Sequence, residues 1–130
     1  MRRLLTIIAC GSLLAGCGAT PQSNSGSADA SFPSVVAATA SRQDDGWKID
    51  VTISSPYDSP ERYADAWRVL APDGTELAVR ILTHDHANEQ PFTRSKSGIE
   101  IPADVAMVTI EGRDLINGWG GDTLEVELER

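Results

Sequence analysis

Cysteine, aromatic side chains and positive charge are all scarce in this sequence of 130 residues. There are two cysteines, and Cys10 lies in a leader, so we expect no internal disulfide in the mature chain. Aromatic residues make up only 5% of the chain, which argues against a large aromatic-lined substrate cavity. No stretch shows sustained helical periodicity, so a helical domain is not expected.

The shortage of basic side chains is more pronounced in the mature protein than in the whole chain. The 11 basic and 19 acidic residues give a formal charge of −8. Removing Arg2 and Arg3 with the leader leaves nine basic against 19 acidic residues, a balance of −10. Nucleic acids and anionic bilayers both require a basic face, so we expect neither nucleic-acid binding nor electrostatic docking to a membrane.

The chain begins with the parts of a secretory signal. Arg2 and Arg3 precede an apolar run over residues 4–15, and small residues follow it. A membrane-spanning helix needs roughly 20 apolar residues, so this run is too short to be one. We interpret residues 1–16 as a signal peptide that is removed, and Cys10 is lost with it.

Residues 14–17 read Leu-Ala-Gly-Cys, which resembles the lipobox of bacterial lipoproteins. The resemblance implies cleavage before Cys17, a diacylglyceryl group on its thiol, and a fatty acyl chain such as palmitate on the new amino terminus. Two or three acyl chains anchor a protein stably to a bilayer. By the sorting rule of many diderm bacteria, Gly18 in place of aspartate favours the outer membrane over the inner one. The alternative is an ordinary signal peptide in which Cys17 is incidental.

Beyond the leader we expect a short tether and one folded domain. Residues 17–31 hold the lipidated Cys17 and a stretch without large apolar side chains, which is typical of a flexible linker. Residues 32–130 are expected to form the domain.

Period-two alternation predicts that this domain is all-β. In residues 47–54, Trp47, Ile49, Val51 and Ile53 share one face, as in a half-buried strand. Trp67 is in phase with apolar neighbours in another run, so both tryptophans are expected in the core. The predicted strands cover residues 35–42, 47–54, 63–70, 76–82, 92–97, 105–112 and 124–129.

Seven short strands in about a hundred residues are typical of an antiparallel β-sandwich. Residues 32–130 resemble the small fibronectin type III-like and immunoglobulin-like domains of bacterial envelope proteins. The resemblance rests on strand number and spacing, and on residues 108–114 followed by a glycine-rich turn and a last strand. The antibody cysteine pair is absent, and no tyrosine precedes the penultimate strand. Residues 84–86 and 91–95 also resemble an uncharacterised bacterial family, which implies no function.

If each strand crosses the sandwich once, the long connections all fall at one end. These connections cover residues 55–62, 83–91 and 113–121, and we expect a contact surface there, because loops vary on a rigid scaffold. The alternative for Tyr57 and Trp119 is that their side chains cover the end of the hydrophobic core and do not belong to a contact surface. The predicted surface consists of Tyr57, Asp58, Asp85, Asn117 and Trp119.

His84 and His86 are the only histidines, and residues two apart on an extended backbone project to the same side. Both imidazoles are therefore predicted to be able to reach one Cu or Zn ion. If the loops converge, the further ligand is expected to be Glu89, with Asp58, Asp85 and Asp114 as the alternatives. The alternative is a loop in which these side chains make local hydrogen bonds and Asp85 caps a turn. No nucleophile elbow or base-orienting group is visible, so catalysis is not expected.

The sequence thus predicts a lipid-anchored, extracytoplasmic β-sandwich of the cell envelope that is not an enzyme. Its expected partners are the bilayer, through acylated Cys17, and an unidentified envelope protein. The main expectation is an interaction or structural module without a cofactor. The alternative is a protein that binds Cu or Zn through His84 and His86.

Overall fold

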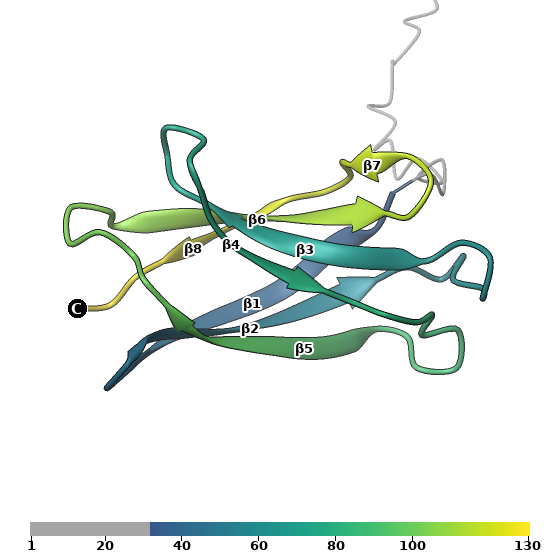
Figure 1. Cartoon of the computed structure of the whole chain (residues 1–130), viewed down its shortest axis with the longest axis horizontal. Helices are drawn as coiled ribbons and strands as arrows, with labels where there is room; N and C mark the ends of the chain where they lie inside the picture. The colour runs from purple at the N-terminus through teal and green to yellow at the C-terminus, as the bar shows by residue number, and fades with distance from the viewer. Residues whose placement is uncertain (1–31) are drawn as a thin grey trace, which may run out of the picture.

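The computed structural model describes residues 32–130, and the predicted leader, Cys17 and tether lie outside them. Eight strands make up the described chain (Figure 1). They are β1 (Ser34–Gln43), β2 (Gly46–Ser54), β3 (Ala64–Leu70), β4 (Glu76–Ile81), β5 (Phe92–Ile99), β6 (Met107–Asp114), β7 (Gly118–Trp119) and β8 (Leu124–Glu127). The described residues include no helix long and apolar enough to cross a membrane.

The strands form two antiparallel sheets that face each other (Figure 1). One sheet has the order β1-β2-β5. In the other, β4, β3 and β6 are adjacent, and β6 pairs with β8 near its beginning and with β7 near its end. The prediction of an all-β domain is confirmed, and each of the seven predicted segments overlaps a strand. The predicted count of seven is corrected by β7, whose two residues are too few to show an alternating pattern.

Apolar side chains from both sheets meet in one core. Trp47, Ile49, Val51 and Ile53 alternate along β2 and are all buried, as the pattern predicts. Trp67 of β3 and residues of β5, β6 and β8 complete the same cluster. The largest of these are fully buried, and burying a large apolar side chain contributes roughly 1.5–3 kcal/mol. This core holds the strands in place and leaves the connections at the two ends.

The connections alternate between the two ends of the sandwich, as the alternation of strand direction predicts (Figure 1). They do not separate by length, because β7 shortens the connection after β6 to residues 115–117, whereas the connection at residues 100–106 is longer. We call the end with residues 55–63, 82–91 and 115–117 the loop end. The opposite end carries the turns at residues 44–45, 71–75 and 100–106, and we call it the hairpin end. The described chain begins at the loop end and finishes at the hairpin end.

The first described residues pack against the segment that follows β7. A Cβ atom on Gly120 would lie 2.7 Å from the Phe32 ring, and one on Gly112 would lie 2.7 Å from Cγ of Pro33. The Val35 amide then donates to the Asp122 carbonyl at 3.0 Å. Because glycine has no side chain at these positions, the chain can approach β6 and the β7–β8 connection closely.

Candidate functional site

Asp58 joins two of the three connections at the loop end. Its carboxylate is buried, and its two oxygens accept the backbone amides of Ala64 at 3.1 Å and His86 at 2.9 Å. The Gln90 side chain links the same two connections. Its oxygen accepts the Ser55 amide at 2.7 Å, and its nitrogen donates to the His86 carbonyl at 3.1 Å. Asp58 was expected on a contact surface, and its burial corrects that expectation.

Asp114, the last residue of β6, organises the third connection. Its buried carboxylate accepts the amides of Ile116 at 2.9 Å and Asn117 at 2.8 Å, and it pairs with Arg62 at 3.1 Å. Burial would raise the pKa of Asp114, but the hydrogen bonds it accepts, first among them the Asn117 amide, outweigh burial and lower that pKa. Asp114 is therefore held ionised and occupied by structural contacts.

Tyr57 lies beside this carboxylate and is half-buried. The Arg62 guanidinium stacks 4.7 Å from the centre of its ring. Burial, and then the neighbouring Asp114 carboxylate, raise the pKa of Tyr57 far above its ordinary value, so the phenol stays protonated. Tyr57 is thus part of the packing around Asp114 and is only partly exposed.

The two histidines lie next to each other but in different environments. Their ring centres are 4.8 Å apart, as expected from their spacing, and His84 is exposed. His86 is only 4% exposed and stacks on Phe92, with 3.7 Å between ring centres. Neither ring nitrogen of His86 has a hydrogen-bond partner in the described part of the chain. Burial, and then the positive charge of Arg94, lower the pKa of His86.

Glu89, the third predicted ligand, is engaged elsewhere. Its carboxylate lies 3.0 Å from the Arg94 guanidinium, and this pairing lowers the pKa of Glu89. Across residues 32–130, no three side chains of the His, Cys, Asp or Glu type are grouped so that they could hold one metal ion. The structure therefore brings together two of the three predicted ligands.

The other residues predicted on the contact surface have separate roles. Asp85 caps its own turn, since its carboxylate accepts the Ala87 amide at 3.2 Å. Trp119 lies between two guanidinium groups on the outer face of the larger sheet, 4.2 Å from Arg68 and 5.1 Å from Arg113. Asn117 is exposed in the β6–β7 turn. These side chains do not form one shared surface with Asp58.

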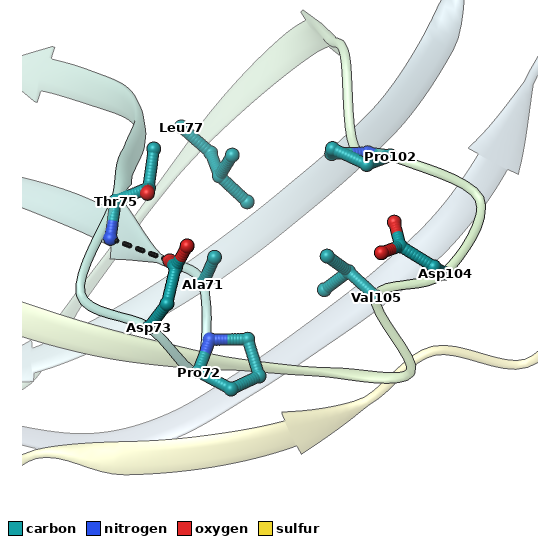
Figure 2. A pocket seen from close by; sticks show the side chains of 8 residues that line it. All are labelled: Ala71, Pro72, Asp73, Thr75, Leu77, Pro102, Asp104 and Val105. Atoms are coloured by element: carbon teal, nitrogen blue, oxygen red, sulfur yellow. Dashed lines mark hydrogen bonds between the residues drawn. The ribbon is translucent and has the colours of Figure 1, made fainter.

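A shallow cavity of about 360 Å³ lies at the hairpin end, opposite to the end predicted from loop length (Figure 2). Asp73 and Asp104 stand on its two sides above an apolar floor, and Asp73 accepts the Thr75 amide at 2.9 Å. The sequence shows only ordinary turns at both segments, so it gave no signal for the cavity. Its lining residues are Ala71, Pro72, Asp73, Thr75, Leu77, Pro102, Asp104 and Val105.

Comparison with known proteins finds a relative that is named as a lipoprotein. A protein of Halomicrobium mukohataei named "Putative lipoprotein" is 37% identical to this chain over 82 residues. The matched part is 63% of this chain and 40% of that protein, so the chain spans less than half the length of this relative. No family model matches the chain, and no solved structure matches it significantly. The lipoprotein resemblance is thus supported by a relative, whereas the immunoglobulin-like resemblance has no match behind it.

The role of Asp58 predicts that its replacement lowers the free energy of unfolding much more than replacement of Asp73, although both aspartates accept backbone amides. Replacing Asp58 by alanine leaves the buried Ala64 and His86 amides without their acceptor and should lower the free energy of unfolding by about 3 kcal/mol. Asp73→Ala is the matched control, because the amide it releases is exposed and water replaces the acceptor, at a cost below about 1 kcal/mol. Urea unfolding measures both, and equal losses would contradict the role of Asp58.

The burial of His86 predicts a loss of stability in mild acid. In the unfolded chain His86 titrates near 6.5, whereas the folded state lowers its pKa. Below pH 6.5 the unfolded chain therefore takes up a proton that the folded protein does not, and the free energy of unfolding falls. The aspartates whose pKa the fold lowers also reduce the free energy of unfolding as the pH falls. They do so only near pH 4, because the ordinary pKa of aspartate is 3.8.

Urea midpoints at pH 7.5, 6 and 5 test this coupling. The midpoint should fall with pH in the wild type and in His84→Gln, and it should change much less in His86→Leu. A His86→Leu variant that loses as much stability as the wild type between pH 7.5 and 5 would contradict the assignment.

Proposed function

We propose that this protein is a lipid-anchored β-sandwich held outside the cytoplasm, where it acts as a non-enzymatic interaction or structural module. The Leu-Ala-Gly-Cys sequence at residues 14–17, together with a relative named as a lipoprotein, carries the proposal. Acyl chains on Cys17 attach the chain to the bilayer, and Gly18 favours the outer membrane. The residues between Cys17 and Phe32 link the anchor to the domain.

The strand order supports an immunoglobulin-like or fibronectin type III-like module. In the lettering of immunoglobulin domains, β1-β2-β5 corresponds to strands A-B-E, and β3, β6 and β8 correspond to C, F and G. β4 pairs with β3 on the side away from β6, which is the position of C′. Sandwiches of this kind present contact surfaces on a rigid core, and this use fits the proposal.

The buried polar groups support a structural rather than a catalytic use of the loop end. The carboxylates of Asp58 and Asp114 are occupied by backbone amides, and Asp114 by Arg62 as well. A general acid or base needs a carboxyl group free to meet a substrate proton. The hairpin end lies opposite to the first described residues and carries the cavity, so we place the contact with an envelope protein partner there.

Replacing the anchor residue tests the proposal directly. Cys17→Ser removes the thiol that would carry the diacylglyceryl group, so the chain should remain an uncleaved precursor without the mass of the lipid. Cys10→Ser is the matched control, because Cys10 leaves with the leader, and it should be processed normally. Intact-mass measurement of both proteins gives the result, and normal cleavage of Cys17→Ser would overturn the proposal.

A second candidate function is binding of Cu(II) or Zn(II) at the histidine pair. The neighbouring imidazoles and the unpartnered ring nitrogens of His86 favour it. In a calorimetric titration, loss of a ligand should weaken binding roughly ten-fold or more, so His84→Ala should bind far less tightly than the wild type. Glu89→Gln is the control, because Arg94 already pairs with Glu89. Equal heats for wild type and His84→Ala would remove this candidate.

A further inference from the structure

Exposed apolar side chains are concentrated towards the loop end. In residues 32–130 five large apolar side chains are exposed. Leu115 and Ile116 form the turn after β6, Ile81 ends β4, and Val36 lies near the beginning of β1. Only Met107, the first residue of β6, lies towards the hairpin end. Isolated exposed apolar residues are common, but a concentration at one end of a small domain indicates a contact surface.

The turn that carries Leu115 and Ile116 is fixed in place. The Leu115 amide donates to the Tyr63 carbonyl at 3.0 Å, and the next two amides donate to Asp114. Leu115 remains 43% exposed and Ile116 67% exposed in this conformation. Their exposure therefore follows from a turn that is hydrogen-bonded to the core.

The chain joins the domain beside this turn. Phe32 and Pro33 lie against Gly120 and Gly112, which are on the two arms of the hairpin that carries the turn, Gly112 within β6 and Gly120 directly after β7. Fifteen residues from Cys17 to Ser31 precede Phe32, and a chain of that length spans about 50 Å at most, whatever its conformation. An anchor at Cys17 thus keeps the loop end within this distance of the lipid.

We propose that the Leu115–Ile116 turn contacts the bilayer that holds acylated Cys17, so that the domain stands with its loop end on the membrane and its hairpin end outward. This inference rests on the proposed lipid anchor. The contact is apolar, because a mature chain with a formal charge of −10 is not attracted electrostatically to anionic lipid headgroups. The anchor supplies the attachment, and the turn sets the orientation.

A spin label at Ile116→Cys tests the contact in the acylated full-length protein, reconstituted in phosphatidylcholine vesicles. Acylated Cys17 carries no free thiol and Cys10 is removed, so the label attaches at one position. Ile116 is mostly exposed, so this change leaves the core intact. Met107→Cys, exposed towards the hairpin end, is the matched control.

The expected result is that vesicles reduce collisions of the label at position 116 with a water-soluble nickel complex several-fold, and leave those at position 107 unchanged. Adding Leu115→Asn should reverse part of this protection. Equal accessibility at both positions on vesicle-bound protein would overturn the inference and leave the anchor intact. Protection in native membranes but not in pure lipid vesicles would assign the turn to a protein partner and also overturn it.

Failure of the anchor gives a different result. A protein without acyl chains would not float with the vesicles and would carry a second labelled thiol at Cys17. That outcome overturns the proposed function, and with it the inference.

Discussion

Two buried carboxylates at the loop end, Asp58 and Asp114, accept the backbone amides that shape its connections. The Ala64 and His86 amides that Asp58 accepts are buried, and each would cost about 1–3 kcal/mol if it lost its acceptor, as much free energy as several buried methylenes contribute. Asp58 joins the connections at residues 55–63 and 82–91, and Asp114 shapes the turn after β6. The arrangement of the loop end depends on these contacts, because loops of this composition have little apolar surface to bury.

The turn after β6 determines the proposed orientation of the domain on the membrane. Since Asp114 fixes the β6–β7 turn, Leu115 and Ile116 are held outward beside the place where the chain joins the domain. In the proposed orientation, this turn faces the bilayer that holds the anchor. The hairpin end, with its cavity between Asp73 and Asp104, then faces away from the membrane. The domain thus has a proposed membrane side and a proposed partner side.

The sheets could be predicted because their signal is local. Alternation along β2 identifies Trp47, Ile49, Val51 and Ile53 as core residues, and the structure confirms all four. The proximity of His84 and His86 likewise follows from their spacing. β7 could not be predicted, because its pairing with β6 depends on a turn and not on a pattern in two residues.

Burial of polar side chains and the position of the cavity could not be predicted, because both depend on contacts between distant segments. Asp58 lies in a polar run that is typical of an exposed turn, and its partner amide at His86 is 28 residues away. The cavity similarly forms between residues 71–77 and 102–105, each of which is an ordinary connection by itself. Glu89 was expected to complete a metal site if the loops converged, whereas in the structure its carboxylate pairs with the Arg94 guanidinium.

The central claim is that the mature protein begins at an acylated Cys17 and is held at the membrane by it. Intact-mass and amino-terminal peptide analysis of the protein extracted from its own membranes measures this most directly. The account predicts an amino-terminal peptide that begins at Cys17 and carries the added mass of a diacylglyceryl group on the thiol. A mature chain that begins at another residue, or one that begins at Cys17 with a free thiol, would contradict it.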